Sequence, residues 1–454
     1  MNILTFANLL WRHMQFQRHR SWTRARLENH QQKSLKQLRT HAYERSRFYR
    51  RFHKGLVECP LPELPVLTKE LVMENFDELV TVPRLKRQEI EEYIKTDGAA
   101  GLYQGQYVVN TTSGSSGHQG IFVFNRPEWF TVVSSYMRME IAKSTSKQLP
   151  RHVKWVYILS MGTHQTHRLV RNFPCEVLSI ADPLPVIVDR LNQMQPHAIG
   201  TYPSVAVILA EEQLKGNLKI TPHILRLGGE PTTGDCWRKV KQAWGDVIYD
   251  IYGTTETGAL AAQCDKSNGW HFWEDLSIVE VVDEKGKPVP PGVSGDKILA
   301  TVLSRYTQPL IRYEINDKIR LAASPCPCHR PFQLIEAIDG RAEETLYFQD
   351  RAGNRVPVYW ITLDKIMEPL PVARWQIAQK PDRLDVLLAG SAPDLDLSRI
   401  EQDLRKVLAA HGAIVPSIQI MRVSEIPRGP TGKAPFFVKS APVRTRLPED
   451  SIVV

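Results

Sequence analysis

The chain has 454 residues, of which 42% are hydrophobic and 24% are charged, as in an ordinary globular protein. This length usually exceeds what one hydrophobic core supports, so we expect a large domain and a smaller one. No run of about 18 apolar residues is present, which excludes a transmembrane helix, and the first eleven residues do not form a cleavable signal. Six cysteines in so long a chain exclude a disulfide framework. We therefore expect a cytoplasmic protein with reduced cysteines.

The formal net charge of +9 is concentrated near the N-terminus. Residues 12–54 contain thirteen Lys or Arg but only Glu28 and Glu44 as acids, so the rest of the chain carries −2. One interpretation is the solvated face of a helix whose apolar side packs on the body of the protein. The other is a docking patch for an anionic partner, such as a carrier protein or a membrane surface. The apolar side of that helix would consist of Leu27, Leu35, Leu38 and Ala42.

The middle of the chain alternates between short apolar runs and segments of helical length. Helices are expected near 204–215 and 235–244. This rhythm is typical of a mostly parallel sheet covered by helices. The expected strands are 153–161, 198–202, 224–227 and 247–251.

From about residue 277 the pattern changes to alternating apolar and polar residues, at 278–282 and 297–302, which predicts a β subdomain. A new unit begins after residue 341. We predict an α/β fold with a large domain over 1–341, built on mixed and parallel sheets, and a small, mobile α+β domain over 342–454. The expected elements of the small domain are strands at 375–379, 383–389 and 417–423 around a helix at 396–411.

Two segments combine hydroxyl groups with glycine. Residues 110–120 hold five hydroxyl side chains and three glycines, a composition that can surround a phosphate chain, although the Lys-Ser/Thr pair of a P-loop is absent. A flexible linker is the alternative, but the apolar runs at 107–109 and 121–124 favour a loop between two strands. Residues 252–258 add an aromatic ring and a carboxylate at an expected strand end, and taken alone they could equally form an ordinary loop.

Three isolated residues could complete such a site. Asp317 could bind a ribose diol, and Arg341 could bind a ribose or a phosphate, although single residues of these types are more often members of surface ion pairs. Lys433 lies on a Gly/Pro-rich loop, from which a mobile domain could bring its ammonium group to a developing negative charge. The alternative for Lys433 is a flexible tail lysine.

Five segments, in this order, resemble the core motifs of the adenylate-forming superfamily, which contains acyl-CoA synthetases, adenylation domains and luciferases. Four shorter segments (46–49, 64–69, 202–204 and 228–230) resemble the phenylacetate-CoA ligase branch, including its capsular polysaccharide relatives. The similarity spans about residues 35–440. The five motifs are TTSGSSGHQG (111–120), YGTTETG (252–258), RYEINDKI (312–319), GRAEE (340–344) and RGPTGKA (428–434).

This resemblance implies a role for each matching position. Thr255 would contact the α-phosphate of ATP, Glu256 would hold Mg²⁺, and Lys433 would serve the adenylation step. Asp317 would bind the ribose hydroxyls, and Arg341 the ribose or a phosphate. The phosphates would also contact Thr112, Ser113, Ser115 and Ser116, while Gly229, Glu230 and Tyr252 would surround the adenine and Gly253 and Thr254 would lie beside the nucleotide.

The chain departs from the superfamily pattern at three places. His118 stands where many relatives have a lysine, so weaker phosphate affinity is expected. Glu343 occupies the place of a hinge aspartate, and the longer carboxylate can still serve as the hinge. Residues 345–350 lack the glycine-containing strand that is common in acyl-CoA ligases, which weakens the case for coenzyme A more than the case for adenylation.

Four residues have the composition of a zinc site. Cys264, His271, Cys326 and Cys328 would complete a tetrahedral shell of three thiolates and one imidazole, with His329 as the substitute ligand. Several phenylacetate-CoA ligase relatives carry a similar arrangement. Because four protein ligands fill the shell, such a zinc ion would be structural. The alternative is a set of small buried cysteines and a surface histidine.

The function implied by the resemblance is ATP- and Mg²⁺-dependent activation of a small carboxylic acid as an acyl-adenylate, followed by acyl transfer to coenzyme A. The alternatives are transfer to a carrier-protein thiol or an amine, and a non-catalytic descendant that binds nucleotide. We expect a monomer or homodimer without a nucleic-acid partner. Residues 160–167, with His164 and His167, are a candidate lining for the acid.

Overall fold

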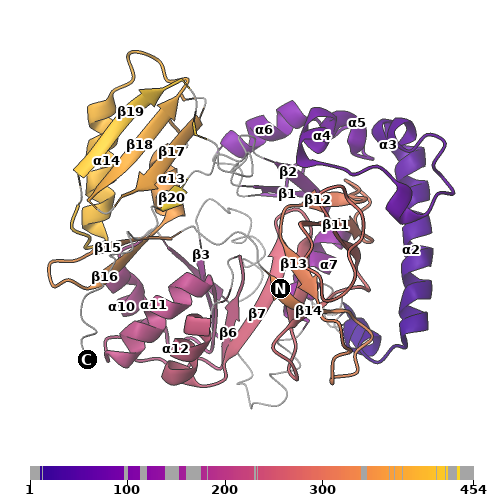
Figure 1. Cartoon of the computed structure of the whole chain (residues 1–454), viewed down its shortest axis with the longest axis horizontal. Coiled ribbons are helices and arrows are strands. Elements are labelled where there is room, and N and C mark those ends of the chain that lie inside the picture. The colour runs from indigo at the N-terminus through magenta and orange to yellow at the C-terminus, as the bar shows by residue number, and fades with distance from the viewer. Residues whose placement is uncertain are drawn as a thin grey trace, which may run out of the picture. The chain divides into compact units, whose positions relative to one another are not determined.

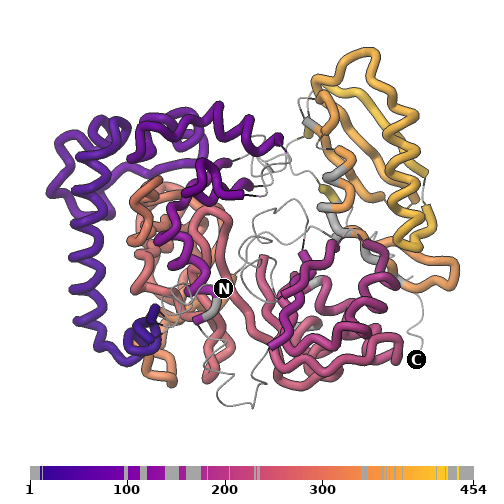
Figure 2. The backbone as a smooth tube through the Cα atoms, turned by 180° about the vertical axis from the view of Figure 1, so that it is seen from behind, coloured from indigo at the N-terminus to yellow at the C-terminus, as the bar shows by residue number. Residues whose placement is uncertain are grey.

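The computed structural model forms two compact units, one comprising Met1–Ser113 and Gln119–Ala342 and the other comprising Gly114–His118 and Glu343–Val454 (Figures 1 and 2). Each unit has its own hydrophobic core. The structure describes residues 11–12, 14–96, 101–112, 120–138, 153–159, 175–180, 182–229, 232, 234–338, 345–367, 369–372, 374–380, 382–415, 417–424, 426–427 and 437–439.

The described strands of the first unit include a nine-stranded sheet in the order β13-β14-β9-β8-β7-β6-β5-β3-β4. Neighbouring strands are parallel from β4 to β7 and antiparallel from β7 to β13. Strand β7 therefore joins the two halves of the sheet. The strands are β3 (Trp155–Leu159), β4 (Cys175–Ser179), β5 (Ala198–Thr201), β6 (Ile224–Leu227), β7 (Ile248–Thr254), β8 (Gly258–Gln263), β9 (Trp270–Phe272), β13 (Ile319–Leu321) and β14 (Leu334–Ile338).

Helices pack on this sheet at defined strands. Helix α11 (Pro203–Leu214) contacts β6, α12 (Gly234–Trp244) contacts β7, and α7 (Arg126–Met137) contacts β8. A fourth helix, α10 (Leu184–Met194), precedes β5. Helix α7 begins with a capping box, in which the Asn125 side chain accepts from the Glu128 N–H and the Glu128 side chain accepts from the Asn125 N–H.

The remaining elements of the first unit are two small antiparallel sheets and a series of helices. Strands β1 (Tyr107–Thr111) and β2 (Ile121–Asn125) form a hairpin, and β10 (Ser277–Val282), β11 (Lys297–Val302) and β12 (Tyr313–Ile315) form a three-stranded sheet. The helices are α2 (Arg24–Arg45), α3 (Arg47–Phe52), the 3₁₀ helix η1 (Leu61–Glu63), α4 (Lys69–Glu74), α5 (Phe76–Leu79) and α6 (Arg87–Lys95).

The second unit is a four-stranded sheet with a long helix, α14 (Leu397–Ala410), and a separate hairpin. Ile400, Leu404 and Leu408 are buried and recur every four residues, which produces one apolar stripe on α14. The sheet order is β19-β18-β17-β20. The other elements are β15 (Thr345–Gln349), β16 (Arg355–Tyr359), α13 (Trp360–Met367), β17 (Arg374–Gln379), β18 (Arg383–Ala389), β19 (Ser417–Val423) and β20 (Phe437–Lys439).

The elements agree closely with the expected ones. The four strands expected in the middle of the chain are β3, β5, β6 and β7, and the two helices are α11 and α12. Strand β7 extends beyond the apolar run at 247–251 because Thr254 still pairs with Gly258 of β8. Cross-strand pairing, rather than hydrophobicity, therefore determines where β7 ends. Among the described residues, no helix combines the length and apolar character needed to cross a membrane.

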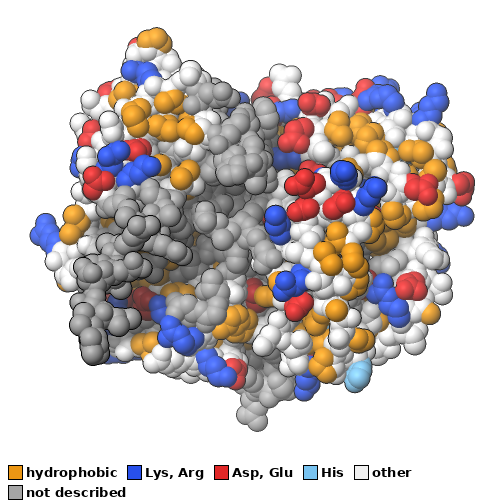
Figure 3. Space-filling view, in the orientation of Figure 1, with side chains coloured by type: hydrophobic (Ala, Val, Ile, Leu, Met, Phe, Trp, Pro, Cys, Tyr) orange, Lys and Arg blue, Asp and Glu red, His pale blue; other side chains and the backbone are white. Residues whose placement is uncertain are grey.

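The basic N-terminal stretch forms α2 and α3, which pack on the first unit. Leu27, Leu38 and Ala42 are fully buried, and Leu35 packs against the core. Arg39 donates to three backbone carbonyls, those of Leu56, Val57 and Cys59. On the visible face of the first unit, basic and acidic side chains are intermixed (Figure 3). These contacts support the interpretation as a packed helix, and docking of an anionic partner stays a prediction.

One buried ion pair joins the end of α7 to the turn after β9. The Arg138 guanidinium donates to Asp275 Oδ1 at 2.7 Å, and both side chains are fully buried. The Trp273 ring centre lies 4.2 Å from this guanidinium, and His19 Nδ1 lies 2.6 Å from Asp275 Oδ2. Burial by itself raises the pKa of Asp275, but Arg138 and His19 together lower it to about 2.

Replacing Asp275 with Asn should destabilise the protein by about 3–5 kcal/mol, because Arg138 would stay buried without its carboxylate. Since the folded pKa of Asp275 lies below its usual 3.8, the stabilisation is present above about pH 4 and is lost as the pH falls toward 2. Denaturant unfolding at several pH values measures this difference. The exposed pair Arg190–Glu176 provides the control, Glu176→Gln, which should change stability by less than about 1 kcal/mol. Equal losses in the two variants would contradict the prediction.

Candidate active site

Two residues predicted to surround the adenine lie at one edge of the parallel half of the sheet. Gly229 follows β6 and Tyr252 lies near the end of β7, while Tyr202, from a segment noted for its branch resemblance, follows the neighbouring strand β5. Because the carboxyl ends of neighbouring parallel strands meet at the same edge, this is where open α/β sheets bind ligands. Gly229 has a φ of +82°, and a Cβ atom there would lie 3.0 Å from the Tyr202 ring, so both conformation and space require glycine.

The motif at 252–258 is the hairpin between β7 and β8. Gly253 packs against the Gly258 carbonyl so closely that an added Cβ would lie 2.5 Å from its oxygen. The Thr254 and Thr257 hydroxyl oxygens lie 3.0 Å apart, and the Thr257 N–H donates to the Thr254 hydroxyl. The Thr254 side chain therefore stabilises the turn.

The tip of this turn carries Thr255 and Glu256, and a buried arginine holds it. Arg305 donates to the backbone carbonyl of Glu256 and lies 4.0 Å from the centre of the Phe124 ring. Burial lowers the pKa of Arg305 to about 10, so the guanidinium stays charged at neutral pH. The Tyr313 hydroxyl lies 3.5 Å from Glu256 Oε1.

Asp317 and Tyr252 contact each other directly. The Tyr252 hydroxyl donates to Asp317 Oδ2 at 2.8 Å, and Asp317 is buried between β12 and β13. The hydrogen bond thus brings the residue predicted to bind the ribose next to the residue predicted to pack on the adenine. The hydrogen bond from Tyr252 also orients the Asp317 carboxylate, so the position of its second oxygen, Oδ1, is fixed as well.

Thr112 closes the base of the hydroxyl-rich loop. Its N–H donates to the Gly120 carbonyl at 3.0 Å, and its hydroxyl accepts from the Gly120 N–H at 2.8 Å. The Lys69 side chain lies at the same place, since a Cβ added to Gly120 would be 3.0 Å from Lys69 Cε. Several predicted residues lie outside the described residues: Ser113, Ser115, Ser116, His118, Glu230, Arg341, Glu343, Lys433 and the candidate lining at 160–167.

Sequence reasoning missed three residues that contact this site. Arg305 precedes the RYEINDKI motif by a few residues, Tyr313 lies inside it, and Lys69 ends a segment noted only for its resemblance to one branch. Tyr313 could have been predicted from the sequence, because it lies within the RYEINDKI motif. Arg305 could not be found this way, since nothing in the sequence distinguishes a buried arginine from an exposed one.

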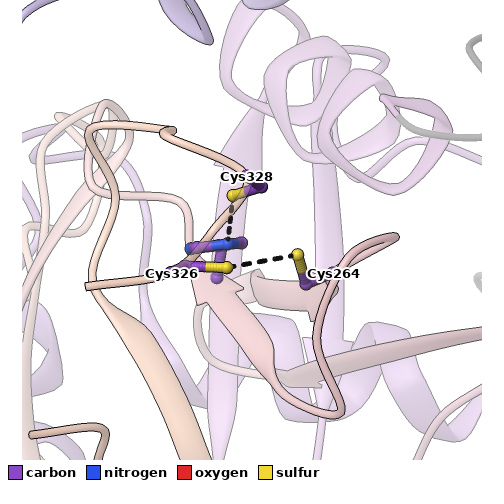
Figure 4. A group of neighbouring side chains, drawn as sticks. Cys264, Cys326 and Cys328 are labelled. Atoms are coloured by element: carbon purple, nitrogen blue, oxygen red, sulfur yellow. Dashed lines mark hydrogen bonds between the residues drawn. The ribbon is translucent and has the colours of Figure 1, made fainter. Parts of the chain in front are cut away.

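The structure brings together the four residues of the predicted zinc shell (Figure 4). Their ligand atoms all lie within 4.8 Å of one another, with Cys264 Sγ 3.6 Å from Cys326 Sγ and Cys328 Sγ 3.0 Å from His271 Nε2. Sulfur ligands of a tetrahedral zinc ion are separated by roughly 3.7 Å, because each Zn–S bond is about 2.3 Å long. The spacing of the cluster therefore fits a zinc ion.

The histidine of this cluster has the protonation state of a metal ligand. Burial lowers the pKa of His271, so the imidazole is neutral at pH 7. His271 Nδ1 lies 3.0 Å from the Phe332 carbonyl, a partner that requires the proton on Nδ1 and leaves the Nε2 lone pair toward Cys328. His329 is exposed, and its backbone N–H donates to the Cys326 carbonyl. His271 is thus the member of the cluster, and the substitute is not needed.

Comparison with known proteins agrees with these motifs. Residues 125–300 match the family described as AMP-binding enzyme. This match confirms the resemblance that was read from the motifs, and it supports an AMP-forming ligase.

The chain is also similar to individual proteins of known name. The phenylacetate-coenzyme A ligase of Thermus thermophilus is 25% identical over 78% of this chain and 78% of its own length. The phenylacetate-coenzyme A ligase of Pseudomonas putida is 27% identical over 70% of this chain and 72% of its own. Among solved structures, 2-hydroxyisobutyryl-CoA ligase in the thioesterification state matches with a TM-score of 0.60 at 19% identity, covering 93% of this chain and 91% of its own. This last likeness confirms the predicted α/β fold class.

Replacing Tyr252 with Phe should raise the KM for ATP roughly five- to tenfold with little change in stability, because Asp317 loses the donor that orients it. Steady-state kinetics of Tyr252→Phe, Asp317→Asn and the double variant measure the effect. The double variant should be little worse than Asp317→Asn alone, since the two side chains act as a unit. Fully additive effects would contradict the predicted coupling.

Proposed function

We propose that this enzyme activates a carboxylic acid with ATP, forming an acyl-adenylate and releasing pyrophosphate, and then transfers the acyl group to coenzyme A. The observation that carries the proposal is the meeting of Gly229, Tyr252 and Asp317 with the Thr255–Glu256 turn at one edge of the sheet. The matched relatives named for coenzyme A ligation support the choice of acceptor.

In the first step, a carboxylate oxygen attacks the α-phosphorus of ATP, and the bond from that phosphorus to the pyrophosphate oxygen breaks. No general base is needed, because a carboxylic acid is already ionised at neutral pH. Thr255 contacts the α-phosphate, and Lys433 offsets negative charge on the phosphate oxygens. A Mg²⁺ ion held by Glu256 supplies further charge stabilisation when bound. In the second step, a thiolate attacks the acyl carbon and AMP leaves.

The two parts of the chain have different roles in this proposal. The large domain, residues 1–341, binds ATP and the acid. The small domain, residues 342–454, contributes Lys433 and turns about Glu343 between the two steps. Transfer to a carrier-protein thiol or an amine is the second candidate. It is motivated by the basic stretch at 12–54 and by residues 345–350, which contain β15 and no glycine.

Exchange of labelled pyrophosphate into ATP across a panel of carboxylic acids tests the first step. At least one acid should stimulate exchange, and Lys433→Ala should lower its rate by roughly a hundredfold or more. Lys406→Ala, an exposed lysine on α14, is the matched control and should exchange normally. A panel without any active acid would favour the non-catalytic, nucleotide-binding alternative. Normal exchange by Lys433→Ala would contradict the assigned lysine.

We also propose that Cys264, His271, Cys326 and Cys328 bind a structural zinc ion. The cluster joins the end of β8 and strand β9 to the connection between β13 and β14. Burial raises the pKa of the Cys326 thiol, and a bound zinc ion would stabilise its thiolate form.

Purified protein should contain about one equivalent of zinc, and Cys326→Ser should lower both the zinc content and the melting temperature, because binding free energy of the metal contributes to folding. Metal analysis and thermal unfolding check this. Cys59→Ser, a half-buried cysteine outside the cluster, should keep its zinc. The metal site would be excluded if the purified wild-type protein contained no zinc and the melting temperature of Cys326→Ser equalled that of the wild type.

A further inference from the structure

Two buried side chains in the connection between β11 and β12 lie close to the outer edge of strand β2. Alternate residues of an antiparallel strand turn their backbone groups away from the partner strand, which for β2 is β1. On that outer edge, the Val123 N–H donates to Gln308 Oε1 at 2.8 Å, and the Gln308 amide donates to the Ile121 carbonyl at 3.1 Å. The Gln308 side chain is fully buried, and it takes the place of a third strand beside β2.

The second of these side chains, Arg305, links Gln308 to the turn that carries Glu256. Its guanidinium donates to Gln308 Oε1 at 2.9 Å and, from Nε, to the Gln308 carbonyl at 3.1 Å. A longer bond of 3.4 Å runs to the Val123 carbonyl of β2, and Nη1 donates to the Glu256 carbonyl. Because one rigid planar group makes all these bonds, it holds β2 and the Glu256 turn at a fixed separation.

Both linked segments carry residues predicted to bind the phosphates of ATP or their metal ion. Strand β2 begins directly after Gly120, whose N–H donates to the Thr112 hydroxyl at the base of the hydroxyl-rich loop. The turn between β7 and β8 carries Thr255 and Glu256, which are both partly exposed. Carboxylate oxygens are suitable ligands for Mg²⁺, and Arg305 uses the backbone carbonyl of Glu256 as its acceptor. The link therefore fixes the turn and leaves the Glu256 carboxylate to a cation.

We propose that Arg305 and Gln308 are positioning residues, which hold strand β2 and the Glu256 turn so that one ATP molecule and its Mg²⁺ meet both segments at once. This inference rests on the nucleotide site of the proposed function. Both side chains are fully buried, so they act through the backbone of the two segments. A buried polar network whose members are hydrogen-bonded is rigid and fixes one arrangement, whereas apolar residues of similar size would only fill the space.

Calorimetric titration with ATP, with and without Mg²⁺ and in the absence of any acid, tests the proposal. Gln308→Met removes both amide bonds to β2 and one acceptor of Arg305 at similar volume. It should reduce the factor by which Mg²⁺ strengthens ATP binding roughly five- to tenfold, because the metal ligand and the phosphate loop are no longer held together. Arg305→Met should act in the same direction, and Arg305→Lys, which keeps the charge and a donor, should restore part of the factor.

Asp275→Asn is the matched control, because it also disrupts a buried network of the first unit but lies outside this link. It should keep the wild-type dependence of ATP affinity on Mg²⁺. Hydrogen–deuterium exchange gives a second readout, since the amides of residues 254–258 should exchange faster in Gln308→Met, although the bonds of Gln308 run to β2 and Arg305. Gln308→Glu, which loses only the donor to Ile121, should show a smaller loss and keeps the test valid if Gln308→Met does not fold.

The possible outcomes separate this inference from the proposed function. An unchanged effect of Mg²⁺ in Gln308→Met, or faster amide exchange confined to β2, would overturn the link between the two segments. An equal loss of ATP affinity with and without Mg²⁺ would reveal a general loss of binding and would also overturn it. If the expected loss is found but no acid supports pyrophosphate exchange, the proposed function fails and the link stands. Wild-type protein that does not bind ATP would contradict both.

Discussion

The candidate active site depends on the two kinds of pairing made by strand β7. On one side β7 is parallel to β6, which brings the ends of β5, β6 and β7 to a common edge. On the other side it is antiparallel to β8, so the chain must reverse immediately and exposes Thr255 and Glu256 at the tip of a tight turn. The close contact of Gly253 with Gly258 makes this reversal possible. A crossover helix at this point would have carried Glu256 away from the edge.

A buried cation keeps this turn in place. Arg305 binds the Glu256 carbonyl and also donates to the Gln308 carbonyl, and Glu128 accepts the N–H groups of Tyr306 and Thr307 beside it. Glu128 also belongs to the capping box of α7, so the start of that helix and the position of the Glu256 turn are linked through one carboxylate. Burying an arginine is costly, and hydrogen bonds together with the Phe124 ring offset that cost. As a result, the backbone of the Glu256 turn is held in place without a bound nucleotide.

Periodicity predicted the strands well, because β5, β6, β11 and β18 are apolar runs with clear ends. It did not predict the end of β7, which tertiary pairing sets. For the cluster of Cys264, His271, Cys326 and Cys328, composition suggested four candidate zinc ligands, but their meeting depends on the pairing of β14 with β9, where Leu334 lies opposite His271. Motif order thus predicted the residues that would bind the nucleotide, but the sequence alone did not show which of them contact one another, as Tyr252 and Asp317 do.

The two halves of the sheet hold different parts of the candidate active site. The parallel half holds Gly229 and Tyr252, which are predicted to surround the adenine. The antiparallel half holds the turn and the cysteine cluster, and strand β8 connects them: Gly258 begins it and Cys264 follows its last residue. Because a shift of one residue would move every side chain of β8 to the other face, anchoring Cys264 also fixes where Gly258 meets Thr254. Metal bound at the far end of β8 would thereby act on the geometry of Glu256 without touching a substrate.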